Sequence, residues 1–403
     1  MSPSNPLTGT AGRRSVLLGA AAAAAAPLAR PAIAQERKLV VGVVLPLSGT
    51  FADQGRNNED GIKVFQKIHG TKVGNITVET VTRDDQGPGS GDLSRRMTQE
   101  LIQRSRAEII LGYSFTPNAL SAASLLTEAK RPGIIINAAT SIITERSPYF
   151  ARVSMTLPQL AASLGTWAAK NGVKTVYTIV SDYGPGLDAE TWFTKAFEAG
   201  GGKVIGGART PVAGMEYSPF LQRAVEARPD GLFSFSPGGD VSVAFMKQTK
   251  ERNIVGSGIK LMVTGDVVDD NLVPAMGDAL DGVVSALHYQ VELDNAENKR
   301  FLEAFREMSG PNAMPSYRTV QAYDGMALIY HALQQTGGKT DAESIMNAIK
   351  GARLNSPRGP IMIDPATRDI VQNIYIRRGQ RKDGRWANIA FETIEGVKDP
   401  AKA

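Results

Sequence analysis

Residues 39–49 read LVVGVVLPLSG, a valine-rich apolar run followed by a short loop of small residues. An apolar run without alternation predicts a strand that is covered on both faces, as in a parallel sheet sandwiched by helices. The pattern recurs along the chain, alternating with helical spacing such as Leu93, Met97 and Leu101. We therefore predict an α/β fold with strands at residues 39–45, 76–82, 108–111, 133–136, 175–180, 203–205, 231–235, 260–263 and 282–287.

The predicted strands fall into two blocks that meet near Pro158, and 403 residues suffice for two domains. Each block predicts a lobe built on a doubly wound parallel sheet. Ligands of such sheets bind beyond the carboxyl ends of the strands. The loops that directly follow the strands are therefore the first place to look for a functional site.

These loops consist mainly of glycines and small hydroxyl residues, with Tyr113, Phe115 and Tyr183 supplying rings. Thr116-Pro117 is a typical helix start, and free backbone N–H groups at such a start can hold a carboxylate. The alternative is that the Thr116 hydroxyl only caps its own helix. The sequence leaves both interpretations open.

Residues 1–34 have the features of an export signal: the pair Arg13-Arg14, an alanine-rich apolar run, and Ala32-Ile33-Ala34 before Gln35. The apolar run is too short to cross a bilayer, and no later stretch approaches the ~20 apolar residues of a membrane span. We expect a soluble, periplasmic chain, exported by the twin-arginine or the general route. The sequence does not decide between the two routes.

Composition excludes several classes of protein. The chain has no cysteine, which rules out disulfides and thiol chemistry. Removing the three arginines of residues 1–34 lowers the net charge from +5 to +2, so we expect no nucleic-acid partner. The densest remaining basic stretch flanks a predicted Asp383-Gly384 hairpin turn, and we interpret it as a solvated edge strand. Its basic residues are Arg377, Arg378, Arg381, Lys382 and Arg385.

Signals of catalysis are few. His69, His288 and His331 have no partner at metal-ligand spacing, so we predict no metal, no cofactor and no catalytic residue. One alternative survives: residues 184–189 fit the pattern G-x-G-x-x-[GA] after a strand, and Arg209 could accept a 2′-phosphate. An exported dinucleotide-dependent oxidoreductase therefore remains a second hypothesis.

A resemblance to a known family rests on four segments and their order along the chain. They are the run at 39–49, Asn137-Ala138-Ala139-Thr140, Asp182-Tyr183-Gly184 and Gln321-Ala322-Tyr323-Asp324-Gly325. In these positions the chain resembles the exported solute-binding proteins of ABC importers, of the branched-chain amino-acid (leucine/isoleucine/valine-binding) type. The resemblance implies two type I periplasmic binding protein lobes joined by three strands. It places the first lobe at residues 35–157 plus 290–357, the second at 158–289 plus 358–395, and a tail at 396–403.

The same resemblance implies roles for site residues. Thr116, Ala138 and Thr140 match positions that hold a ligand carboxylate, and Tyr183 matches a closing residue of the second lobe. Asp266 matches the partner of a ligand ammonium group, although it could instead cap the short helix that follows. Gln54 stands where a ring often packs. The full candidate set is Gln54, Tyr113, Phe115, Thr116, Ala138, Ala139, Thr140, Tyr183, Ser236 and Asp266.

The rings of Tyr113 and Phe115 stand where the amino-acid binders usually have small residues, which favours a flat ligand. The ligand is thus expected to be a small carboxylate, either a branched-chain or related amino acid or an aromatic or phenylpropanoid acid. We expect a monomer that captures this solute by closure and delivers it to a membrane permease without changing it. A ligand sensor with the same fold remains a third hypothesis.

Overall fold

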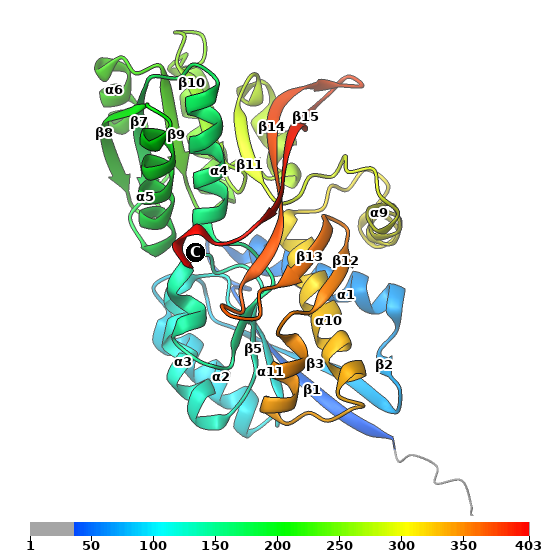
Figure 1. Ribbon diagram of the computed structural model, residues 1–403. Coiled ribbons are helices and arrows are strands. Elements are labelled where there is room, and N and C mark those ends of the chain that lie inside the picture. Colours follow the sequence, from blue (N-terminus) through cyan, green and yellow to red (C-terminus); the bar gives the residue numbers. More distant parts are fainter. Residues whose placement is uncertain (1–35, 403) are drawn as a thin grey trace, which may run out of the picture. The chain divides into compact units, whose positions relative to one another are not determined.

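The computed structural model describes residues 36–402, and from Arg37 onward the described chain forms one compact unit (Figure 1). The predicted export signal at residues 1–34 lies outside the described residues. Among the described helices, none is both long and apolar enough to cross a bilayer.

The first sheet is mostly parallel, with strand order β2-β3-β1-β4-β5-β6. The central strand β1 pairs in parallel with both β3 and β4. Both of its faces are buried: Val41 and Val43 pack toward helices α1 and α10, and Val44 packs toward α2 and α3. The strands are β1 (Arg37–Leu45), β2 (Lys72–Val73), β3 (Ile76–Asp84), β4 (Ile109–Gly112), β5 (Gly133–Ile135) and β6 (Phe150–Arg152).

The second sheet has the order β12-β13-β14-β11-β10-β9-β7-β8, with β15 paired to β14. Strands β7 to β11 run parallel to their neighbours within this set, whereas β14 is antiparallel to β11, β13 and β15. The strands are β7 (Thr175–Ser181), β8 (Lys203–Thr210), β9 (Gly231–Phe235), β10 (Lys260–Thr264), β11 (Val284–Leu287), β12 (Arg353–Ser356), β13 (Gly359–Ile363), β14 (Ile370–Lys382) and β15 (Arg385–Val397).

Helices cover both faces of each sheet, as the continuous apolar strands predict. Helices α4 and α5 lie together on one face of the second sheet (Figure 1). Helices α6 and α7 pack on the other face. The helices are α1 (Ala52–His69), α2 (Gly91–Gln103), α3 (Thr116–Ala129), α4 (Leu157–Lys170), α5 (Gly184–Ala199), α6 (Ser218–Ala227), α7 (Asp240–Glu251), α8 (Val273–Met276), α9 (Ala296–Ser309), α10 (Tyr317–Gln335) and α11 (Ala342–Ile349).

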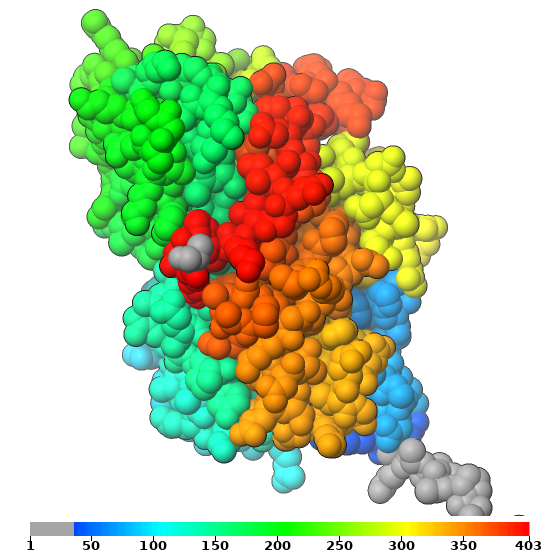
Figure 2. Space-filling model, in the orientation of Figure 1, coloured from blue at the N-terminus to red at the C-terminus, as the bar shows by residue number. Residues whose placement is uncertain are grey.

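Short 3₁₀ turns complete the fold: η1 (Ser141–Glu145), η2 (Asp270–Leu272), η3 (Gly277–Leu280) and η4 (Pro400–Lys402). The last turn, η4, contacts α4, and Asp399 just before it accepts a hydrogen bond at 2.6 Å from the hydroxyl of Ser141, the first residue of η1. Figure 2 shows these C-terminal residues, in red, at the surface between the green α4–α5 region and the cyan region of α3.

The structure corrects the interpretation of the basic stretch near the C-terminus. The Asp383-Gly384 turn is confirmed, because Lys382 pairs with Arg385 across it and both turn residues have positive φ, 50° and 79°. Arg377, however, is fully buried, so a solvated edge strand is wrong for its part of β14. The reason is tertiary: β14 lies between β11 and β15 there, and Arg377 donates to the carbonyl oxygens of Tyr289 and Gly265.

Candidate ligand-binding site

The carboxyl ends of strands from both sheets meet around one small cavity. Its volume is about 10 Å³, which is room for about one water molecule. Strands β4, β5, β7, β9 and β10 lead into it, and the start of α10 closes one side. The lining residues are Ser114, Phe115, Asn137, Ala139, Met155, Leu157, Tyr183, Pro185, Phe235, Pro237, Asp266, Tyr317 and Arg318.

Aromatic rings from both lobes contribute to the cavity wall. Phe115 follows β4 and packs against Phe51 with ring centroids 5.0 Å apart. On the opposite side Tyr183 stacks on Phe235 at 6.0 Å with an interplanar angle of 24°. Tyr317 adds a fourth ring to the lining. Such a wall suits a flat, apolar guest.

Arg318 places a buried cation at this cavity, with only 2% of its surface exposed. Its Nη2 donates to the carbonyl oxygen of Pro237 at 2.8 Å, and its Nη1 lies 3.3 Å from Oδ2 of Asp269. The third nitrogen, Nε, has no hydrogen-bond partner among the described residues. A buried donor without a partner is costly, so a ligand oxygen at Nε would be stabilising.

Asp266 supplies the opposite charge and follows β10. It is 2% exposed, and its Oδ1 has no hydrogen-bond partner among the described residues. Burial raises the pKa of this carboxyl to about 6, although nearby groups, including the Arg318 cation, oppose the rise. The N-cap residue of the following turn η2 is Asp269. Asp266 lines the cavity, and the capping position of η2 is held by Asp269 instead.

Asn137 and Gln54 add further polar atoms from the first lobe. Asn137 donates through Nδ2 to the carbonyl oxygen of Ser114 at 2.8 Å, and Gln54 donates through Nε2 to that of Pro237 at 2.8 Å. The side-chain oxygens of both residues are buried and have no partner within residues 36–402. Gln54 itself is not part of the cavity lining.

The two predicted threonines bond to each other. The hydroxyls of Thr116 and Thr140 lie 2.8 Å apart. Helix α3 begins at Thr116 and has no side-chain hydrogen bond at its cap, so the interpretation of Thr116 as a helix cap is wrong. The pair lies under the start of α5, where a Cβ added to Gly184 would sit 2.7 Å from Oγ1 of Thr140.

Of the predicted residues, Phe115, Ala139, Tyr183 and Asp266 line the cavity, and six lie outside its lining: Gln54, Thr116 and Thr140, described above, and Tyr113, Ala138 and Ser236. Tyr113 points into the core, and its hydroxyl lies 2.8 Å from Oγ1 of Thr98. The amide of Ala138 donates to the carbonyl oxygen of Tyr113 at 2.9 Å. The Ser236 hydroxyl lies 2.5 Å from that of Ser242.

Comparison with known proteins identifies the family. The model of a family described as periplasmic binding protein matches residues 38–385. The chain belongs to this family. Leu/Ile/Val-binding protein homolog 6 of Brucella melitensis is 40% identical over 361 residues, which are 89% of this chain and 92% of that protein.

Solved structures of solute-binding proteins of ABC transporters agree with this assignment. One from Rhodopseudomonas palustris, in complex with 3,4-dihydroxybenzoic acid, is 45% identical with a TM-score of 0.88 and covers 91% of this chain and 99% of that chain. Another from R. palustris, in complex with 4-hydroxybenzoate, is 42% identical with a TM-score of 0.87, covering 90% and 99%. The type I periplasmic binding protein fold and the expectation of an ABC-transporter solute-binding protein are confirmed.

In this periplasmic binding protein the glycines of the dinucleotide-like pattern have a packing explanation. A Cβ on Gly186 would lie 1.8 Å from the carbonyl oxygen of Ser181, so α5 can approach β7 closely only without a side chain there. Arg209, the predicted phosphate ligand, forms a surface ion pair with Glu190 at 3.0 Å. The fold and the relatives are those of transport-type binding proteins rather than enzymes.

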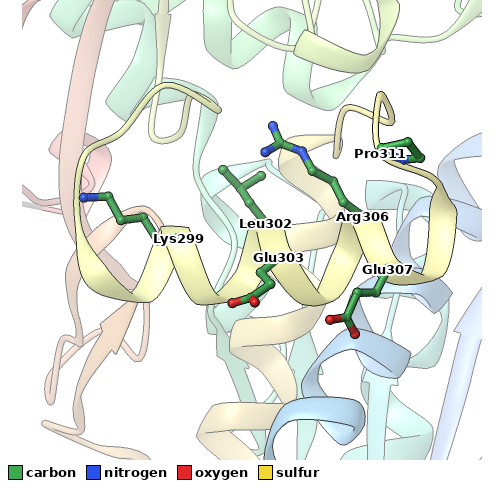
Figure 3. A pocket seen from close by; sticks show the side chains of 6 residues that line it. All are labelled: Lys299, Leu302, Glu303, Arg306, Glu307 and Pro311. Carbon is green, nitrogen blue, oxygen red and sulfur yellow. The ribbon is translucent and has the colours of Figure 1, made fainter.

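Sequence reasoning missed Arg318, Tyr317, Phe235 and Pro237. Arg318 stands at the start of α10, off the apolar stripe of that helix, and no local pattern marks it as buried. Tyr317 and Arg318 follow no strand, whereas ligands of parallel sheets are expected at the loops after strands. Larger hollows lie elsewhere, including one of about 590 Å³ along α9 (Figure 3). Within the described residues no group of three or more acidic or histidine side chains could hold a metal ion.

Proposed function

We propose that this protein is exported to the periplasm, binds a small aromatic carboxylate of the hydroxybenzoate class between its lobes, and delivers it to the permease of an ABC importer. The observation that carries the ligand class is the composition of the cavity. Four rings surround it, and a buried guanidinium and a buried carboxylate each present an unpartnered atom.

These atoms match the chemistry of such a ligand. The carboxylate would accept a hydrogen bond from Nε of Arg318, where a charge-assisted bond replaces an unmade one. A ring hydroxyl would donate to one of the free oxygens, Oδ1 of Asp266 or Oδ1 of Asn137. The ring would lie against Phe115 and the stacked pair Tyr183–Phe235. The similar R. palustris proteins were crystallised with hydroxybenzoates, which supports this class.

Entry requires the lobes to separate. The cavity of about 10 Å³ is far smaller than the ~150 Å³ cavity that accommodates benzene in an engineered protein. Gln54 and Arg318, on α1 and α10, both donate to Pro237 after β9, and these bonds must break when the cavity widens. We propose that the lobes comprise residues 35–157 plus 290–357 and residues 158–289 plus 358–395. Ligand binding would shift the population toward the closed form.

A branched-chain amino acid is the second candidate ligand. Asp266 favours it, because a buried carboxylate with a free oxygen can pair with an ammonium group. The Brucella relatives carry the name Leu/Ile/Val-binding protein homolog. The aromatic wall nevertheless offers more ring contact than an aliphatic side chain uses.

Calorimetric titration of the mature chain with 4-hydroxybenzoate, benzoate and leucine tests the ligand class. We expect the tightest binding for 4-hydroxybenzoate, weaker binding for benzoate, which lacks the hydroxyl, and none for leucine at the same concentrations. Binding of leucine but not of either aromatic acid would overturn the aromatic assignment. Chromatography of the ligand after prolonged incubation should return it unchanged, since we propose capture without chemistry.

Periplasmic location and delivery need separate tests. Fractionation of cells that express the full chain should place the protein in the periplasm, with its N-terminus near Gln35. Replacement of Arg13-Arg14 by two lysines should block export only if the twin-arginine route is used. Uptake of labelled 4-hydroxybenzoate should fail in cells that lack this protein and return when it is supplied.

A further inference from the structure

A second crevice lies on the side of α9 and is separate from the interlobe cavity. Its volume is about 360 Å³, within the ~300–1,000 Å³ that is typical of small-molecule pockets. Its apolar lining includes Val273, Pro274, Met314 and Trp386, and two arginines, Arg306 and Arg385, border it. None of these residues belongs to the lining of the interlobe cavity.

Arg306 is the unusual group in this crevice. It is half-buried, and its guanidinium forms no hydrogen bond or ion pair with any of the residues from 36 to 402, although its backbone carbonyl accepts from Gly310 at 2.9 Å. Figure 3 shows why: Arg306 points to the same side of α9 as Leu302, whereas Glu303 and Glu307 point to the other side. The acids nearest in sequence therefore leave this guanidinium uncompensated.

The other charges of the crevice are already paired. Arg385 donates to Oε1 of Glu292 at 3.0 Å, and its Nη1 lies 3.9 Å from the sulfur of Met314. Asp270 lies 3.6 Å from Arg377 and accepts a hydrogen bond from Asn388 at 2.8 Å. Arg381 lies over the Trp386 ring at 5.0 Å but is not part of the lining, so the unpaired charge within the crevice lining is the Arg306 cation.

We propose that this crevice is a second binding site for a small organic anion with a flat, apolar body. A carboxylate or sulfonate would take the guanidinium of Arg306, while the body would lie against Trp386 and Met314. The site does not depend on which solute occupies the interlobe cavity.

The position of the crevice gives such a ligand a mechanical effect. Helix α9 packs on α1, beside the first sheet, whereas α8 and β15 pack on each other and β15 belongs to the second sheet. A molecule held between Arg306 and Trp386 would therefore touch elements of both lobes. It would favour whichever lobe arrangement preserves both contacts.

The test uses 2-naphthoate as the probe and the mature protein labelled with 5-fluorotryptophan. The chain has three tryptophans, so the fluorine spectrum is simple, and a Trp386→Phe variant assigns the resonance of interest. We expect 2-naphthoate to shift the Trp386 resonance saturably. Arg306→Gln should weaken that binding about tenfold or more, because it removes a charge-assisted contact.

Two further variants make the outcome decisive. Asn312→Asp adds a negative charge at an exposed position of the crevice lining, is nearly isosteric, and should weaken binding several-fold with no effect on folding. Lys299→Gln is the matched control: it removes a cation from the same helix, but outside the crevice, where Lys299 pairs with Asp294 at 2.6 Å. Its affinity should equal that of the unsubstituted protein. A Trp386 shift that does not saturate, or equal affinities in Arg306→Gln, Asn312→Asp and Lys299→Gln, would overturn the proposal.

Discussion

Buried arginines occur in two settings in this protein, and the two differ in how completely they are paired. Arg152, between the sheets, uses every nitrogen: Nε lies 2.7 Å from Asp369, and its Nη atoms donate to the carbonyl oxygens of Ala138, Met155 and Ser141. Asp369 in turn accepts from Lys402 at 2.6 Å. Arg318, at the cavity, keeps Nε without a partner.

The difference in hydrogen bonding separates an arginine that holds the fold from an arginine that can bind a ligand. A buried charge with all its hydrogen bonds made holds the fold in one arrangement, and losing a partner is costly. A buried charge with an open donor is a cost that a ligand can remove. For these two arginines, completeness of pairing, more than burial or charge, separates the one that holds the fold from the one that can bind a ligand.

The largest effect should come from breaking the complete network. Asp369→Ala leaves Arg152 and Lys402 without their shared anion, and we expect the free energy of unfolding to fall by about 3–5 kcal/mol. Urea unfolding monitored by circular dichroism measures it. Asp294→Ala, which breaks the exposed pair with Lys299, is the control and should cost at most about 1 kcal/mol. Equal losses in the two variants would contradict the comparison.

Replacing Asp266, the buried acid at the cavity, should change the free energy of unfolding in the opposite direction. Burial raises the pKa of Asp266 from 3.8 to about 6. Between about pH 4 and pH 6 the folded state therefore keeps a proton that the unfolded state has released, so the free energy of unfolding falls as the pH rises through this range. Above about pH 6 the carboxyl is ionised in both states and the loss is complete. Asp266→Asn should therefore raise the free energy of unfolding by up to about 3 kcal/mol at pH 7.5. The gain should vanish below about pH 4, where both states are protonated.

Unfolding at several pH values between 4 and 7.5 checks this prediction. A constant difference between Asp266→Asn and the unsubstituted protein would show that the carboxyl is not the cause. Affinity for 4-hydroxybenzoate should fall in the same variant if Asp266 accepts the ring hydroxyl.

A smaller effect should follow from obstructing closure. Gly184→Ala places a methyl group 2.7 Å from Oγ1 of Thr140, so the lobes can close fully only if Thr140 moves. We expect ligand affinity to fall about tenfold, for a cost of the order of 1–2 kcal/mol, while the melting temperature changes little. Combining it with Thr140→Ala should restore part of the loss. Additive losses in the double variant would argue against the clash.

The smallest effect should distinguish the two tyrosines. Tyr183→Ala removes a ring of the cavity wall and should weaken aromatic-acid binding by about 0.5–1.5 kcal/mol without unfolding the protein. Tyr113→Phe removes only the hydroxyl that bonds to Thr98 in the core and should leave the affinity unchanged. Calorimetry on both variants decides, and a loss in Tyr113→Phe alone would reverse the assignment.

Local patterns in the sequence predicted the central parallel strands well, because an apolar run buried on both faces leaves its mark on every residue. The sequence analysis did not predict β2, β6, β12 and β13, and β8 extends five residues beyond its predicted end. The observed β9 matches the predicted range at both ends, and β1, β3, β7 and β10 differ by at most two residues at an end. The Asp383-Gly384 turn was predictable for the same reason, since both residues tolerate positive φ.

The errors arise where a residue's partner is distant in the sequence. The Thr116 hydroxyl bonds to Thr140 rather than to its own helix. Arg377 is buried because β14 lies beside β11, some 90 residues earlier. Arg318 enters the cavity from a helix start that no strand precedes. Pairings of this kind depend on the tertiary fold and leave no local pattern.

The hydrogen bonds between the C-terminal residues and the region of Ser141 restrict how the lobes can separate. Asp399 and Lys402 bond to Ser141, Thr144 and Asp369, while η4 contacts α4. If these bonds persist when the lobes part, the rotation axis must pass close to this corner of the molecule. The bond between Gln54 and Pro237, which is no part of this group, would then be among those that break to admit a solute.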